Sequence, residues 1–141
     1  MPQFPVLIRD AGGTTVVATS TARIIKPPKI ERGKEFQTCE WNIECLNIEM
    51  FSGSNPGGTY DPLLYAMIVS TIPIIGVADG TFFMAERSED SFKPYIGTDG
   101  EGAWTRMYNH SGKITFTLKQ SSPTNDALSL LLKLDEITAP V

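Results

Sequence analysis

Apolar and polar residues alternate strictly over Lys113–Lys119. Three apolar residues share one phase and two threonines share the other: Ile114, Phe116 and Leu118 against Thr115 and Thr117. This period of two is typical of a strand that is buried on one face. Because β-branched threonines suit the exposed face of a sheet, the pattern predicts a strand with both threonines toward solvent.

A helix is predicted directly after this strand, over residues 122–136. Ser122 offers a side-chain oxygen at the N-cap, and Pro123 lacks the N–H that would be unpaired at the first helical position. Asp126 lies on the favourable side of the helix dipole. The apolar stripe comprises Ala127, Leu128, Leu131, Leu132 and Leu134, and the polar side comprises Asn125, Ser129, Lys133, Asp135 and Glu136. So wide a stripe must pack against another element, most simply a sheet.

Short apolar segments elsewhere predict further strands. Phe4–Asp10 enters the turn Ala11-Gly12-Gly13, Thr14–Ala18 returns as its hairpin partner, and Ala22–Ile25 continues up to Pro27-Pro28. A long strand over Glu40–Met50 changes phase at Cys45-Leu46, which predicts a bulge or a change of buried face there. After the flexible stretch Ser52–Gly58, short strands are expected over Tyr65–Ser70, Ile72–Val77 and Thr81–Arg87.

The composition fits one mainly β domain over residues 1–141, an antiparallel β-sandwich or barrel-like fold with one α-helix. Hydrophobic residues make up 41% of the chain, which argues against disorder. The net charge of -4 and a pI near 4.9 give no basic surface for gripping nucleic acid through its phosphates. No signal peptide and no membrane span are expected.

The two cysteines lie on one predicted strand. Six residues at about 3.3 Å each separate Cys39 from Cys45 by roughly 20 Å, which is too far for a disulfide. We therefore expect both thiols to be reduced, with Cys45 in the core. Two cysteines and the single His110 supply too few ligands for a metal site, and no cofactor is expected.

Five acidic residues gather between positions 86 and 101: Glu86, Glu89, Asp90, Asp99 and Glu101. Paired carboxylates can do acid–base chemistry, but no motif fixes their geometry, and solvated strand ends are the simpler explanation. His110 has no serine or cysteine beside it in a nucleophile motif and is expected near the surface. The chain is therefore not expected to be an enzyme.

The segment Phe92–Tyr108 is rich in glycine and aromatic residues, which predicts a long hairpin or projecting loop. Segments of that length in a small domain are usually functional or interfacial. Tyr95, Trp104, Arg106 and Tyr108 are therefore candidates for a subunit interface, since large amphipathic side chains concentrate in association surfaces. For the three aromatic residues, ordinary packing in the core is the alternative.

Several segments together resemble the tail tube proteins of contractile-tailed bacteriophages. They are Gly76–Phe83, Glu86-Arg87 with Glu89-Asp90, Gly97–Glu101, Ser111-Gly112 and Thr115–Leu130. Residues 4–55 also resemble that family, through FPVLIRDAGGTTVV, Lys26-Pro27-Pro28 and Glu40–Cys45. In the family the two halves stand in the opposite order. The chain thus resembles a circular permutant, engineered or natural: residues 1–52 match the family's C-terminal half, 53–58 form a linker and 59–141 match its N-terminal half.

The resemblance implies a structural function. It suggests a β-sandwich whose copies, six to a ring, stack into a tube that conducts DNA from the virion inside a sheath protein, after synthesis in the host cytoplasm. Six copies at -4 give -24 per ring, and an acidic channel lets DNA pass without specific binding. Glu86, Asp90 and Glu101 are candidates for channel-facing acids. The alternatives are the inner tube of a contractile bacteriocin or secretion system, and a ligand-binding β-sandwich that uses the 92–108 segment.

Overall fold

The computed structural model describes residues 3–11, 13–35, 37–54, 65–78 and 80–138. These residues form the strands β1 (Phe4–Asp10), β2 (Val16–Ile24), β3 (Thr38–Cys45), β4 (Ile48–Phe51), β5 (Tyr65–Val69), β6 (Ile72–Pro73), β7 (Phe83–Arg87), β8 (Phe92–Ile96), β9 (Gly102–Arg106) and β10 (Gly112–Lys119), followed by helix α1 (Thr124–Thr138). The predicted class is confirmed: the described chain is mainly β, with antiparallel pairing and a single helix.

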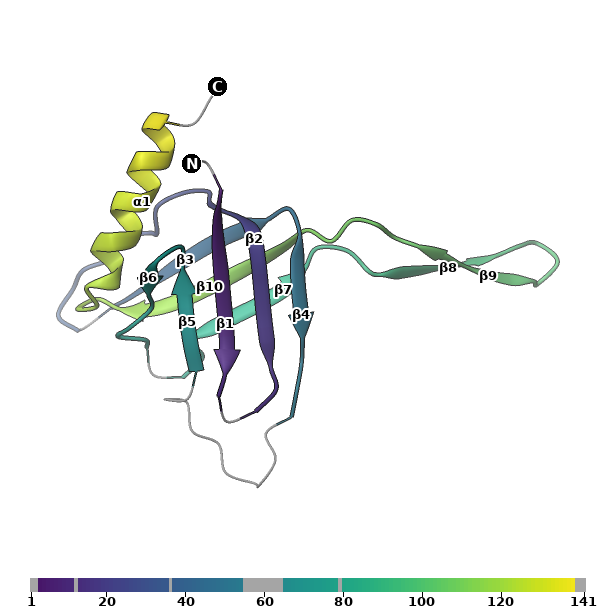
Figure 1. Ribbon diagram of the computed structural model, residues 1–141, viewed down its shortest axis with the longest axis horizontal. Coiled ribbons are helices and arrows are strands. Elements are labelled where there is room, and N and C mark those ends of the chain that lie inside the picture. The colour runs from purple at the N-terminus through teal and green to yellow at the C-terminus, as the bar shows by residue number, and fades with distance from the viewer. Residues whose placement is uncertain (1–2, 12, 36, 55–64, 79, 139–141) are drawn as a thin grey trace.

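Eight of the strands belong to one sheet in the order β6-β5-β1-β2-β3-β10-β7, with β4 also paired to β2. Figure 1 shows β5, β1, β2 and β4 side by side in one layer, and β3, β10 and β7 crossing behind it. Strand β2 joins the layers, because its first half pairs with β4 and its second half pairs with β3. The sheet is therefore folded over itself into a sandwich-like body.

The core lies between these two layers. In β1 alternate residues are buried, and β3 likewise buries every second side chain. Trp41, Ile43 and Phe116 are among the largest side chains with almost no exposure. Aromatic contacts also join β5 to the start of β7. The centre of the Tyr65 ring on β5 lies 5.6 Å from the centre of the Phe82 ring and 5.4 Å from that of the Phe83 ring.

The predicted change of phase at Cys45-Leu46 is confirmed, and it divides the layers. Strand β3 ends at Cys45, Leu46 is exposed, and β4 begins at Ile48. The Thr19 hydroxyl donates to the Asn47 carbonyl at 2.6 Å, which holds the break against β2. Gly112 leaves room for Ile48 there, since a Cβ on it would lie 2.5 Å from Ile48 Cγ2. The chain thereby leaves β10 and follows β2 into the other layer.

Most of the predicted strand limits hold within a few residues. Phe4–Asp10 has the predicted bounds, the two segments after the first turn merge into β2, and β7 begins at Phe83 rather than Thr81. The prediction over Ile72–Val77 is wrong beyond Pro73, because the next residues bind the start of the helix instead: the Ile75 N–H donates to Thr124 Oγ1 at 3.2 Å. Gly12 and residues 55–64, which include most of the proposed linker, lie outside the described residues.

The two threonines of β10 are less exposed than the alternation predicts. Thr115 is 6% exposed and Thr117 is half-buried. The Thr115 hydroxyl donates to Asn42 Oδ1 on β3 at 3.1 Å. On that face the cross-strand neighbours of Thr115 are Asn42 on β3 and Met84 on β7, and their side chains shield it.

The cap predicted for the helix is confirmed. Ser122 Oγ accepts a hydrogen bond from the Thr124 N–H at 3.3 Å and donates to the Ile75 carbonyl at 2.5 Å. The regular helix begins two residues after the predicted start because Ser122 and Pro123 form its cap and first position, and it extends two residues past the predicted end.

One part of the predicted apolar stripe is wrong. Leu128 and Leu132 are buried as expected, but Leu134 is 59% exposed and Asp135 is buried. At 100° per residue, Asp135 follows Leu128 and Leu132 on the same face, whereas Leu134 is turned away. The Asp135 carboxylate is compensated by Arg23 Nε at 3.0 Å, which ties the helix to β2.

Replacing Ser122 with alanine should destabilise the fold by about 1–2 kcal/mol, because it removes the cap and the bond to the Ile75 carbonyl. The measurement is urea denaturation followed by circular dichroism. Ser121→Ala, one residue away and exposed, is the matched control and should change the free energy of unfolding by less than about 0.5 kcal/mol. Equal losses in the two variants would contradict the assigned cap.

Candidate functional site

The most distinctive feature of the surface is a projecting hairpin, residues 92–106, which we call the arm. Strands β8 and β9 pair with each other and with no other described strand. The Met107 N–H donates to the Ser91 carbonyl at 2.8 Å and closes the base of the arm. Figure 1 shows the arm extending away from the body, on the side opposite α1. The predicted hairpin or projecting loop is thus confirmed as a hairpin.

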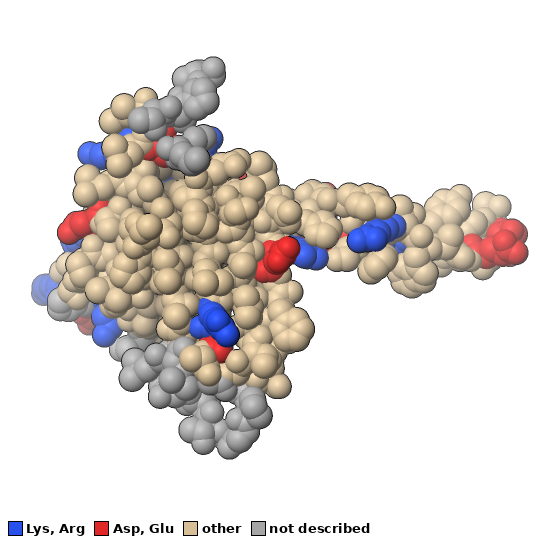
Figure 2. Space-filling model, in the orientation of Figure 1, with Lys and Arg blue, Asp and Glu red and all other residues tan. Residues whose placement is uncertain are grey.

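The tip of the arm is a glycine turn. The Gly97 N–H donates to the Glu101 carbonyl at 2.8 Å, and the Gly100 N–H donates to the Gly97 carbonyl at 3.0 Å. Gly100 has φ +88°, a conformation that disfavours any residue with a Cβ. Acidic side chains gather at this distal end, and basic ones lie along the shaft (Figure 2). The charges of the arm are therefore separated along its length.

The two faces of the arm differ in chemistry. Cross-strand partners share a face, and the pairs are Phe92↔Arg106, Lys93↔Thr105, Pro94↔Trp104, Tyr95↔Ala103 and Ile96↔Gly102. One face therefore carries Phe92, Pro94, Ile96 and Trp104, with Arg106 toward the base; we call it the apolar face. The opposite face carries Lys93, Tyr95, Ala103 and Thr105. All ten strand residues are exposed, so nothing in the described chain covers the apolar face.

The four candidate interface residues all lie on or beside the arm. Trp104 and Arg106 share the apolar face, Tyr95 lies on the opposite face, and Arg106 sits 5.4 Å from the centre of the Tyr108 ring. Exposures of 67–79% for the three aromatic side chains exclude the alternative that they pack in the core. Phe92 and Ile96 were missed by the sequence analysis, although their alternation with polar or small residues was the available signal.

The three candidate channel-facing acids are not brought together. Glu86 lies on β7 in the body, Asp90 in the turn before the arm, and Glu101 at the tip. All three are exposed. The acids between positions 86 and 101 therefore form no single cluster, and no group of three or more His, Cys, Asp or Glu side chains within the described ranges is placed to hold a metal ion.

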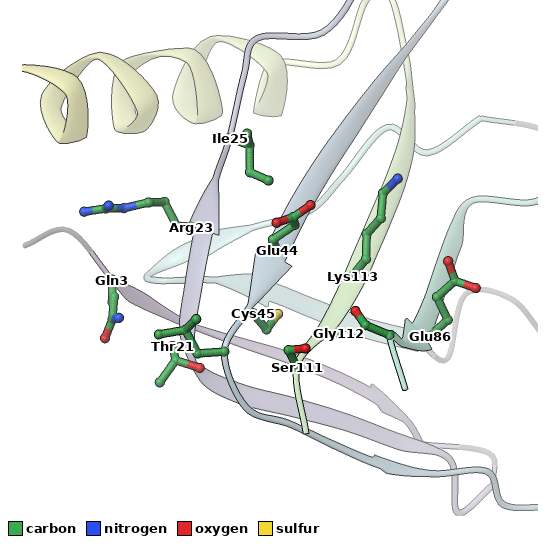
Figure 3. A pocket seen from close by; sticks show the side chains of 12 residues that line it. Gln3, Thr21, Arg23, Ile25, Glu44, Cys45, Glu86, Ser111, Gly112 and Lys113 are labelled. Atoms are coloured by element: carbon green, nitrogen blue, oxygen red, sulfur yellow. The ribbon is translucent and has the colours of Figure 1, made fainter. Parts of the chain in front are cut away.

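A cavity of about 590 Å³ opens on the outer face of β2, β3, β10 and β7. The strand registers place Arg23 opposite Glu44, Glu44 opposite Lys113, and Lys113 opposite Glu86, so opposite charges alternate across four strands. Figure 3 shows Arg23 pointing away from Glu44, and its guanidinium pairs with Asp135 instead. The lining carries two basic and two acidic side chains, so its formal charges sum to zero and the cavity offers no net charge to an ionic ligand.

Cys45 lies beneath this cavity. Both cysteines are buried on β3 and free, as predicted. Burial raises the pKa of the Cys45 thiol, although a hydrogen bond involving Thr19 opposes the effect. A buried, protonated thiol is a poor nucleophile, so Cys45 has the properties of a structural residue rather than a reactive one. His110 is half-buried, and its carbonyl accepts the Ile48 N–H at 2.9 Å.

Comparison of the chain with protein-family models, with curated proteins and with solved structures finds no match. The stretches of chain described above contain no helix long and apolar enough to cross a membrane. The arguments that follow therefore depend on the geometry of the arm and the body.

Both thiols should react slowly with a disulfide reagent at pH 8 and completely once the protein is unfolded in guanidinium. Burial of Cys39 and Cys45, together with the raised pKa of Cys45, is the physical reason. The measurement is the time course with which the reagent's own thiol is released, with and without denaturant. Rapid reaction of either thiol in the native protein would be inconsistent with the assigned core.

The two tryptophans should differ sharply in their effect on stability. Trp104→Ser should change the free energy of unfolding by less than about 0.5 kcal/mol, because the side chain is exposed. Trp41→Phe should cost about 1–3 kcal/mol, since Trp41 is buried and its Nε1–H donates to Asn125 Oδ1 at 3.0 Å. Chemical denaturation of the monomeric chain at low concentration measures both values, and a large loss for Trp104→Ser there would mean that the arm packs on the body.

Proposed function

We propose that this protein is a self-assembling structural subunit of a tail tube, as in contractile-tailed bacteriophages, in circularly permuted form. In this proposal its copies form rings, expected to be hexameric, and the rings stack into a conduit for DNA. The partners are further copies of the chain and, in the virion, a sheath protein. DNA passes through without specific binding.

The observation that carries this proposal is the apolar face of the arm. An isolated two-stranded hairpin is marginally stable in water. Burial of its exposed apolar surface against a partner would contribute a favourable free energy of about 25 cal/mol per Å². Phe92, Ile96 and Trp104 are between 57% and 74% exposed on an arm that rests on no other described element. Aromatic residues exposed together in this way are typical of association surfaces.

Strand edges on the body also support assembly. Within the described chain, β7 pairs with β10 alone and β6 pairs with β5 alone. Open edges of this kind pair with other chains unless they are covered, and closure of a ring is one way to cover them. The resemblance to tail tube proteins, set out above, accounts for both features through a single function.

The alternatives predict different particles. The inner tube of a contractile bacteriocin or secretion system would form the same rings and differs only in its biological context. A ligand-binding β-sandwich that uses the arm would remain dispersed. No enzymatic role is proposed, because the acidic residues considered above lie on separate parts of the fold.

The protein should form rings or short tubes with a central channel in negative-stain electron microscopy, and its mass in light scattering should be a multiple of 15.5 kDa. Replacing residues 92–106 with a short Gly-Ser turn should leave a folded monomer, because every strand residue of the arm is exposed. A strictly monomeric intact chain across a wide concentration range would refute the proposed function.

A further inference from the structure

Strands β4 and β7 form a V-shaped opening at one side of the body. Their ends meet where Arg87 Nη2 donates to the Ile48 carbonyl at 3.1 Å. From that point β4 continues along β2 while β7 follows β10, so the two strands belong to different layers. The break after Cys45 therefore leaves a gap between two strand edges.

A second cavity, of about 210 Å³, lies in this opening. Its apolar lining is contributed by Val17, Met50, Phe51, Phe83, Met84 and Ala85. Pockets for drug-sized ligands usually measure roughly 300–1,000 Å³, so this volume fits one large side chain better than a free ligand. Phe51 and Met84 are 63% and 58% exposed, so the rim of the cavity is apolar as well. Methionine side chains adapt readily to an aromatic guest.

A carboxylate lies beside the cavity on β4. Glu49 stands two residues before Phe51 and on the same face of the strand, toward the end where β4 meets β7. The opening therefore presents an apolar cavity and, at two residues of strand rise or about 7 Å, one acidic side chain. Glu86 on β7 takes no part, because it lies on the outer face of the other layer, opposite Lys113.

The arm carries the matching pattern. Trp104 and Arg106 share the apolar face and are two residues apart, which is the same spacing of about 7 Å. An aromatic anchor in an apolar pocket with an arginine beside it is the usual composition of an interface hot spot. Charge, size and spacing thus agree between a surface and a cavity that lie on different parts of one chain.

We propose that the arm of one copy docks into the β4/β7 opening of a second copy, with Trp104 in the 210 Å³ cavity and Arg106 beside Glu49. The inference rests on the proposed function and names the contact between copies. The contact is heterologous, because arm and opening are different surfaces. Each copy gives one arm and receives another, so repetition closes into a ring or continues as a filament.

A complementation experiment tests this contact directly. One variant, Trp104→Ser, loses the anchor but keeps the opening, and a second, Met84→Glu, places a charge in the opening but keeps the arm. Both sites are exposed, so both variants should fold, as circular dichroism will verify. Each alone should associate at least about 30-fold more weakly than the intact chain. A mixture should form a 1:1 complex of about 31 kDa, twice 15.5 kDa, and nothing larger.

Fluorescence identifies the residue that is buried. The chain has two tryptophans, and Trp41 is already buried, so in the mixture only Trp104 of the Met84→Glu copy can gain protection from acrylamide. Thr105→Ala, on the opposite face of the arm and exposed, is the control and should assemble like the intact chain. Arg106→Glu should weaken association, and Glu49→Lys in the other copy should restore part of it.

The outcomes separate the two proposals. If the intact chain assembles but Trp104→Ser assembles equally well, the docking mode is wrong and the proposed function stands. If both variants are impaired and their mixture forms no 1:1 complex, the arm does not use this opening, and the docking mode is again wrong. If the intact chain is monomeric at every concentration, both proposals fail.

Discussion

The structure depends on one break in a strand. Between Cys45 and Ile48 the chain stops pairing with β10 and continues along β2, so one long apolar segment contributes to both layers. Without the break, Ile48–Phe51 would extend the β3 side of the sheet, and the layer of β5, β1 and β2 would lose the strand at its edge. Three polar contacts around Asn47 and the absence of a side chain at Gly112 make the turn possible at close quarters.

The same break creates the opening between β4 and β7. A continuous sheet would pair these strands, whereas here they join only where Arg87 meets the Ile48 carbonyl. Below that bond each strand keeps an unpaired edge and an apolar side chain facing the gap. The packing of the core and the exposed edges of β4 and β7 therefore have one cause, and the proposed contact would fill the gap between these edges.

The arm differs from the body in how its apolar side chains are covered. In the body, apolar side chains are buried by neighbouring strands; in the arm, two strands of five residues have no third strand to cover them. The unfavourable exposure of Phe92 and Trp104 is tolerable in a small hairpin because the folded body supplies the net stability. It becomes an advantage only in the presence of a partner, which is why the arm and the opening are considered together.

Local patterns in the sequence predicted the features that depend on residues close together in the chain. The alternation in β10, the cap at Ser122, the break after Cys45 and the hairpin near Gly100 each depend on side-chain spacing or backbone preference within a few residues. The errors lie where distant segments meet. Thr115 is buried because Asn42 and β7 flank it, Asp135 is buried because Arg23 compensates it, and Ile75 leaves the strand because it binds Ser122 and Thr124 at the start of the helix.

By itself, the sequence determined the mainly β class, the single helix and a projecting aromatic hairpin. Only the tertiary structure decided that Met84 and Phe51, more than thirty residues apart, line one cavity. The reason is that a periodic pattern encodes which side of an element is buried, whereas the identity of its neighbour depends on long-range pairing across the two layers.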